Sequence, residues 1–173
     1  MKNKLCSLLL IIFLSMQSVI AGLYDNPVNI SSFVGKLPQI TNIECTFKQE
    51  KHLKNIAKPF ISGGNFYFEK DKGVTFETIY PVKSTVSYSN KDYKQINDII
   101  LAISKKKYSK LEKEFNFYYQ QNNNEWQMGL KPKNKSRVEE YIDFITIKGT
   151  DYINQININL KNGNNTIIWF MKK

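Results

Sequence analysis

Apolar and polar residues alternate along most of this chain, and that period of two predicts β-strands. The clearest example is the segment 58–81, in which two alternating runs flank a turn at residues 70–73. One face of this predicted hairpin carries the apolar side chains Phe66, Phe68, Val74 and Phe76. Gly63 and Gly64 are adjacent in its first strand, where they indicate a bulge or a bend rather than a flat ladder.

The alternation recurs in seven further segments, so that about nine strands are expected in all. These segments are 41–53, 82–88, 115–119, 126–130, 141–148, 153–160 and 166–170. Short polar turns separate many of them, including Asn162-Gly163, a dipeptide typical of tight hairpins. Successive hairpins favour an antiparallel meander that curves into a barrel or half-barrel.

Two segments have a helical pattern instead. Residues 26–37 begin with Asn-Pro and stop before Pro38, which predicts a short helix ahead of the strands. In the segment 92–114 an apolar stripe recurs at the spacing of one helix face. The stripe consists of Ile96, Ile99, Ile100 and Ile103. Such a helix needs an apolar partner, and the concave face of the sheet is the nearest one. The predicted fold class is therefore mainly β with α.

The first 21 residues are interpreted as a secretory signal peptide. Lys2 and Lys4 precede an apolar run at residues 8–14, and a small residue, Ala21, closes the segment. The run is shorter than the ~20 residues that a membrane-spanning helix needs. We therefore expect cleavage after Ala21 and a secreted single domain formed by residues 22–173.

The composition narrows the class of partner. The two lysines among the first 21 residues lower the net charge from +10 for the whole chain to +8 for residues 22–173. A basic surface suits acidic partners such as anionic lipids or acidic proteins. Nucleic acid is not expected, since a secreted protein rarely meets it. Cys45 is the single cysteine after residue 21 and is expected to be a small buried apolar residue on a strand.

Residues with catalytic or metal-binding chemistry are scarce. The chain has one histidine, His52, which together with Cys45 cannot complete a tetrahedral metal site. No nucleophile elbow, phosphate loop or dinucleotide fingerprint occurs. We therefore expect no enzymatic activity, no metal and no cofactor. The abundance of aromatic residues is compatible either with a filled core or with an apolar cavity between the sheet and the helices, and the pattern leaves both open.

Five short motifs follow the predicted signal peptide in a fixed order. They are Phe47-x-Gln49, Ser62-Gly63, Gly73-Val74-x-Phe76 with Pro81 and Ser84-Thr85, Leu130-Lys131-Pro132, and Leu160-x-x-Gly163-x-x-Thr166-x-Ile168-x-Phe170. In order and spacing they resemble the LolA-like periplasmic lipoprotein carriers, and the resemblance spans nearly the whole chain after residue 21.

The resemblance implies an antiparallel, strongly curved sheet, or incomplete β-barrel, with an N-terminal helix and a central lid helix over an apolar cavity. It implies a periplasmic carrier that receives acylated lipoproteins, or a related lipid, from an inner-membrane lipoprotein-releasing transporter and delivers them to an outer-membrane acceptor. We expect a monomer. Strand phase selects the cavity-wall candidates Phe47, Phe66, Phe68, Val74, Phe76, Trp126 and Met128. The lid candidates are Ile96, Ile99, Ile100 and Ile103.

The chain departs from that family at one position. Members of the family have an arginine beside the aromatic residue in the strand before the proline, where this chain has Glu77. Its one arginine, Arg137, lies in a predicted loop far along the chain, so no arginine latch for the lid is expected. The alternative function is a non-enzymatic envelope binding or sensor module of the same fold, with a basic surface for an acidic partner.

Overall fold

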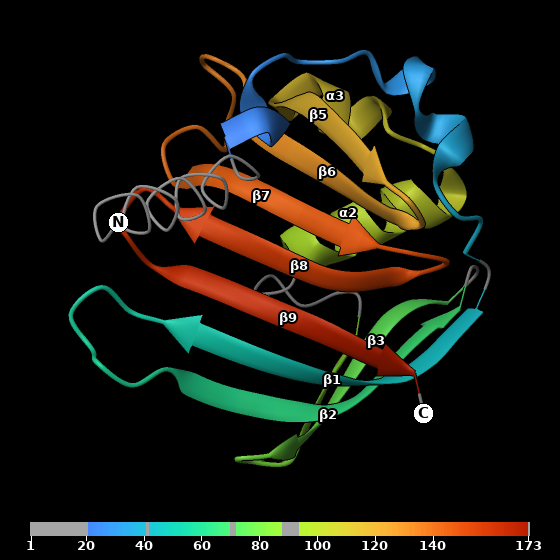
Figure 1. Cartoon of the computed structure of the whole chain (residues 1–173). Coiled ribbons are helices and arrows are strands. Elements are labelled where there is room, and N and C mark those ends of the chain that lie inside the picture. The colour runs from blue at the N-terminus through green and yellow to red at the C-terminus, as the bar shows by residue number, and fades with distance from the viewer. Residues whose placement is uncertain (1–20, 41, 70–71, 88–93, 173) are drawn as a thin grey trace, which may run out of the picture.

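A computed structural model describes residues 21–40, 42–69, 72–87 and 94–172, and its main element is one nine-stranded antiparallel sheet (Figure 1). The strands are β1 (Asn42–His52), β2 (Phe60–Glu69), β3 (Gly73–Tyr80), β4 (Ser84–Ser87), β5 (Phe115–Asn122), β6 (Glu125–Pro132), β7 (Ile142–Gly149), β8 (Ile153–Leu160) and β9 (Asn165–Lys172). This arrangement confirms the nine alternating segments that the sequence predicts.

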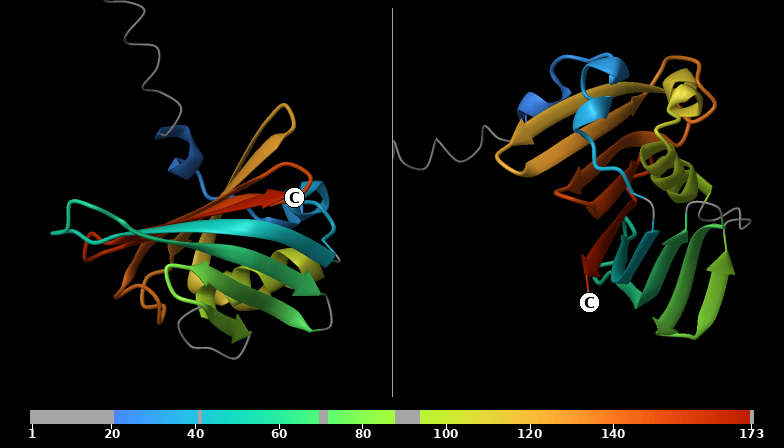
Figure 2. Two further views of the ribbon diagram at one scale, coloured as in Figure 1. Left: turned by 90° about the horizontal axis from the view of Figure 1, so that it is seen from below. Right: turned by 90° about the vertical axis from the view of Figure 1, so that its right-hand side faces the viewer.

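The sheet consists of two meanders joined through one long-range strand pair. The strand order is β4-β3-β2-β1-β9-β8-β7-β6-β5, so β1 pairs with β9 and both meanders continue outward from that pair. In the register of this pair Phe47 lies opposite Phe170. Strands β4 and β5 form the two edges, and the sheet curls without closing (Figure 2, right). An antiparallel, strongly curved, incomplete barrel is thus confirmed.

Of the bulge or bend predicted at the paired glycines, the structure has a bulge. Gly63 lies opposite Tyr80, whereas the next residue, Gly64, lies opposite Thr78, so β3 contains one extra residue at this step. A Cβ atom on Gly64 would lie 2.0 Å from the carbonyl oxygen of Glu77. Glycine is needed here because the backbones of β2 and β3 approach too closely for any side chain.

The segment predicted to be helical at 92–114 forms two helices, α2 (Lys94–Lys105) and α3 (Ser109–Glu114), and residues 92 and 93 lie outside the described residues. The helices are separated at Lys106, whose φ angle is 51°. In the right-hand view of Figure 2, α2 lies on the concave side of the curled sheet, across its opening. Among the residues described, no helix combines the length and apolar character needed to cross a bilayer.

The N-terminal helix takes a different form from the one predicted. Within 26–37 the chain forms two short 3-10 helices, η2 (Ile30–Ser32) and η3 (Val34–Lys36), instead of one helix, and a third, η1 (Ala21–Tyr24), precedes them. The Asn29 side chain accepts a hydrogen bond from the Ser31 amide, and the Ser32 hydroxyl donates to the Asn29 carbonyl. Such local side-chain bonds compete with the hydrogen bonds of a continuous α-helix. This explains why the prediction of one helix was wrong and the chain forms short 3-10 helices instead.

The two faces of the sheet are covered by different segments. On the convex face the ring of Tyr24 packs edge-on against Tyr118 and Phe144, with centroid distances of 5.2 and 5.3 Å. On the concave face Phe33, which lies between η2 and η3, stacks on Tyr119 at 4.5 Å. Together with α2 and α3, this segment encloses the main core against the concave face.

Candidate functional site

Helix α2 rests on the sheet through an apolar face. The side chains of Ile99, Ile100 and Ile103 are 1%, 1% and 0% exposed, as the helical stripe predicts. The fourth predicted member, Ile96, has a side chain that lies outside the described residues. Ser104 is also buried, and its hydroxyl donates to the carbonyl of Ile100, so its polar group is satisfied within the helix. The contact between α2 and the sheet is therefore made mainly by hydrocarbon.

Four phenylalanines from four neighbouring strands meet beneath the helix. The ring of Phe66 lies 5.0 Å from Phe76 and 4.7 Å from Phe170, and Phe47 lies 5.1 Å from Phe76. Three of these residues were predicted cavity-wall positions. Phe170 was not among them, although its alternation with Ile168 on the last strand carried the necessary signal.

The other predicted wall residues divide between the two halves of the sheet. Phe68 and Val74 are buried and pair with each other across β2 and β3, beside the phenylalanine cluster. Met128 and Trp126 are buried on β6, in the opposite half of the curl. The Trp126 indole donates to the carbonyl of Thr150 at 2.7 Å, which fixes this ring in one orientation.

Among the described residues, little empty space remains between α2 and the sheet. The cavity there measures about 10 Å³, at the lower limit for one water molecule. Its lining consists of Ile43, Phe66, Ile100, Ile153 and Phe170. The protein's own side chains fill this part of the concave face, so an acyl chain can enter here only if α2 moves.

A larger pocket lies beside α2, toward α3 and the loop at 133–141. It measures about 250 Å³ and combines an apolar floor with a charged rim. The floor is formed by Ile99, Leu111, Phe115, Val138 and Ile145, and the rim by Asp98, Lys110, Glu114, Arg137 and Tyr141. Since Ile99 contributes to this floor, the pocket reaches the buried face of α2.

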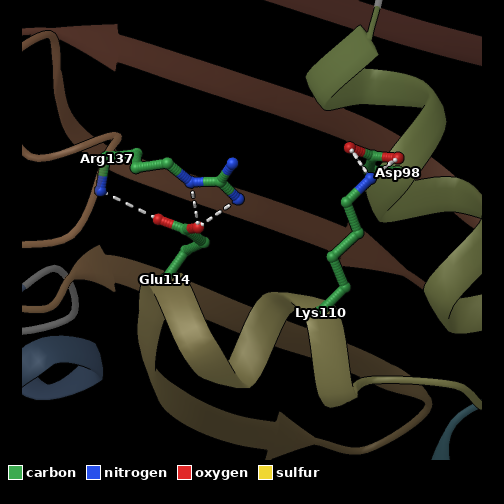
Figure 3. A network of polar contacts seen from close by, with 4 residues as sticks. All are labelled: Asp98, Lys110, Glu114 and Arg137. Carbon is green, nitrogen blue, oxygen red and sulfur yellow. Dashed lines mark hydrogen bonds and ion pairs between the residues drawn. The ribbon is translucent and has the colours of Figure 1, made fainter.

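Two ion pairs on this rim fasten α2, α3 and the following loop to one another (Figure 3). Lys110 of α3 donates to both carboxylate oxygens of Asp98 of α2 at 2.7 Å. Arg137 donates from Nε and Nη2 to Glu114 Oε1 at 2.9 and 2.7 Å, and its backbone amide donates to Oε2 at 3.0 Å. The arginine thus holds α3 to the loop, and a lysine is the cation that holds α2.

These contacts predict a shifted titration of Glu114. The hydrogen bonds from the Arg137 guanidinium lower the pKa of the Glu114 carboxyl below its ordinary value of 4.5. The stabilisation is therefore complete above the pKa of the unfolded chain and is lost as pH falls through the lower pKa of the folded chain. An NMR titration should give Glu114 a pKa below 4.5 that rises in Arg137→Gln. Equal values in the two proteins would show that the ion pair does not form in solution.

Glu77, at the position where the resemblance to LolA-like carriers led us to look for an arginine, does not face α2. Its carboxylate accepts hydrogen bonds from Asn65 at 2.9 Å and from the Tyr67 hydroxyl at 3.4 Å. Asn65 and Tyr67 alternate with the buried Phe66 along β2, so the carboxylate lies on the convex face. Position 77 is therefore not placed to fasten the helix.

The residues that could carry other chemistry lie apart from this site. The His52 side chain is 43% exposed at the end of β1, with Nε2 3.3 Å from Glu50. Cys45 is fully buried on β1, as predicted. Within the described ranges no three His, Cys, Asp or Glu side chains are grouped so that they could hold a metal ion.

No protein-family model matches the chain, and no curated protein matches it in sequence.

Proposed function

We propose that this protein is a periplasmic carrier that holds the acyl chains of lipoproteins, or of a related lipid, between the concave face of its sheet and α2. The observation that carries the proposal is the contact between α2 and an unclosed sheet. One short helix covers the opening of the sheet, and its buried face is formed mainly by isoleucine and alanine. An acyl chain offers the sheet the same kind of surface as the isoleucines, so it can take their place when α2 moves aside.

The state with α2 on the sheet and the state with an acyl chain in its place have similar burial energies. Each buried isoleucine contributes about 1.5–3 kcal/mol, and each buried acyl CH₂ contributes about 0.8 kcal/mol. Two to four CH₂ groups therefore replace one isoleucine, and about 6–12 replace the three described ones. This is within the length of a single acyl chain. The free energy of replacing the helix by cargo is then close to zero, so that cargo can be both loaded and released.

The resemblance to the LolA-like carriers supports the rest of the proposal. The donor would be an inner-membrane lipoprotein-releasing transporter, and the recipient an outer-membrane acceptor. Residues 1–21 would direct export and be removed. No bond is made or broken in such a cycle, because the carrier only exchanges one apolar environment for another.

Binding of a fluorescent fatty-acyl probe to residues 22–173 tests the function. We expect saturable binding that an acylated peptide displaces and the same peptide without its acyl group does not. The affinity should change little with ionic strength, because apolar burial is not screened by salt. Native mass spectrometry should show the acylated peptide bound. Absence of probe binding, or binding that falls steeply with salt, would contradict the carrier function, and the second result would favour the alternative of a basic surface for an acidic partner.

A further inference from the structure

Exposed apolar side chains are concentrated at one end of the sheet. Of the eight large apolar side chains that are exposed among the described residues, six come from residues 56–82. They are Ile56, Phe60, Ile61, Ile79, Tyr80 and Val82. Val82 is 73% exposed and Tyr80 is 61% exposed, so these side chains project into solvent rather than cover the core. A group of this kind marks an interaction surface.

The strand registers place the two segments that carry these residues at one end of the sheet. Phe60 lies opposite Lys51 at the start of β2, and Tyr80 lies opposite Gly63 at the end of β3. The β1–β2 loop and the β3–β4 turn therefore extend from neighbouring strands at the same end of the sheet. In the left-hand view of Figure 2 the β1–β2 loop projects beyond the rest of the sheet. We call residues 51–61 and 79–83 the apolar end.

The apolar end is also strongly basic. It contains four exposed lysines, Lys51, Lys54, Lys58 and Lys83, and neither of its two segments contains an Asp or Glu. The acidic residue that precedes it on β1, Glu50, is held by Lys48 at 2.8 Å. Projecting apolar side chains interspersed along the chain with exposed lysines complement a surface that has phosphate groups outside and hydrocarbon inside.

We infer that the apolar end docks on an anionic lipid surface. The lysines lie at the level of the headgroup phosphates, and Phe60, Tyr80 and Val82 enter the boundary between headgroups and acyl chains. A second copy of the chain is a poor occupant, because it would bring four further lysines against these four. Docking goes beyond the proposed carrier function and does not require cargo. The docking surface and the carrier site are connected through β3, which carries part of the apolar end and also contacts α2.

Vesicle flotation tests the inference on residues 22–173, which contain every described strand and helix except the first residue of η1. The wild type should float with vesicles of phosphatidylglycerol and phosphatidylcholine and not with phosphatidylcholine alone, and salt should weaken its binding. Lys83→Ser should weaken binding about fivefold, the effect of one lysine at an anionic surface. Val82→Asp should weaken it by roughly tenfold or more, because it replaces an inserted apolar group by a repelled charge.

Matched variants outside the apolar end provide the controls. Met171→Asp changes an exposed apolar residue on β9, and Lys113→Ser changes an exposed lysine on α3, and neither should alter flotation. Fatty-acyl probe binding in solution should be unchanged in all four variants, so failure of the carrier function and failure of docking are distinguishable. Equal flotation with both kinds of vesicle, no flotation at all, or equal loss in control and test variants would overturn the inference. A further contrary result is that the wild type floats with no vesicle while Val82→Asp still loses cargo delivery. That combination would identify a protein, and not a lipid surface, as the partner of the apolar end.

Discussion

Replacing Ile100 by aspartate is expected to detach α2 from the sheet while the sheet itself stays folded. Ile100 is 1% exposed and lines the small space above Phe66 and Phe170. A carboxylate buried there would have to lose its hydration without a partner, which costs several kcal/mol. The helix can avoid that cost by leaving the sheet, so the loss of stability is at most its docking energy, about 5–9 kcal/mol for three buried isoleucines. We expect a loss of about 3–5 kcal/mol.

Hydrogen exchange and probe binding can measure this detachment. In Ile100→Asp the amides of α2 should lose their protection while those of β1 and β9 keep it. The melting temperature should fall by roughly 10 °C, the scale for a loss of this size in a domain of this length. Access of a fatty-acyl probe to the concave face should become faster, because α2 no longer has to move first.

Ile147→Asp is the matched control for this experiment. Ile147 is also fully buried, but it lies on β7 between Met128 of β6 and Ile156 of β8. Its strand cannot leave without breaking two hydrogen-bonded ladders, so this variant should not fold. If Ile100→Asp unfolded as completely as Ile147→Asp, α2 would be a fixed part of the core and not a cover that can open.

The strands were predictable because each one obeys a local rule. The period of two gave all nine strands, and in every strand except β4 one face is buried by other segments. The Asn162-Gly163 turn followed from residue type, and Gly163 has the positive φ angle, 84°, that such a turn requires. The burial of Ile99, Ile100 and Ile103 followed from the spacing of the apolar residues along α2.

The contacts that fasten the helices were not predictable in the same way. Glu114 and Arg137 are 23 residues apart, and nothing in their local sequence links them. The pairing of β1 with β9, which brings Phe170 beside Phe66, also depends on the whole fold. Whether the concave face is filled or empty depends on how closely the side chains fit, which alternation alone does not determine.

Two kinds of contact hold α2 in place, and they respond differently to the surroundings. The isoleucine face is insensitive to salt, whereas the Asp98–Lys110 pair is on the surface, with 57% of the lysine side chain exposed, and is screened by ions. The apolar contact therefore supplies most of the docking energy, and the ion pair sets the position of α2 relative to α3. An acyl chain competes directly with the contact between the isoleucine face of α2 and the sheet.

Gly64→Ala is expected to cause a large loss of stability because it adds a methyl group where two strands are in backbone contact. The new Cβ would lie 2.0 Å from the Glu77 carbonyl oxygen and 2.9 Å from the Ile79 amide nitrogen. Both are main-chain atoms of β3, so no side-chain rotation relieves the overlap. The β2–β3 ladder must separate at the bulge, and we expect a cost of about 3 kcal/mol or more, against a total of about 5–15 kcal/mol for a domain of this kind.

Gly35→Ala is the matched control, because a Cβ at Gly35 meets no atom within 4 Å. Its free energy of unfolding should stay within about 0.5 kcal/mol of the wild type. Urea unfolding followed by tryptophan fluorescence compares the three proteins, and a lower midpoint with an unchanged slope identifies a loss of stability in the folded state. The bulge also accommodates the extra residue Ile79, next to the exposed Tyr80. Similar midpoints for Gly64→Ala and Gly35→Ala would therefore mean that the bulge can rearrange, and that the curvature of the sheet does not depend on a glycine at this step.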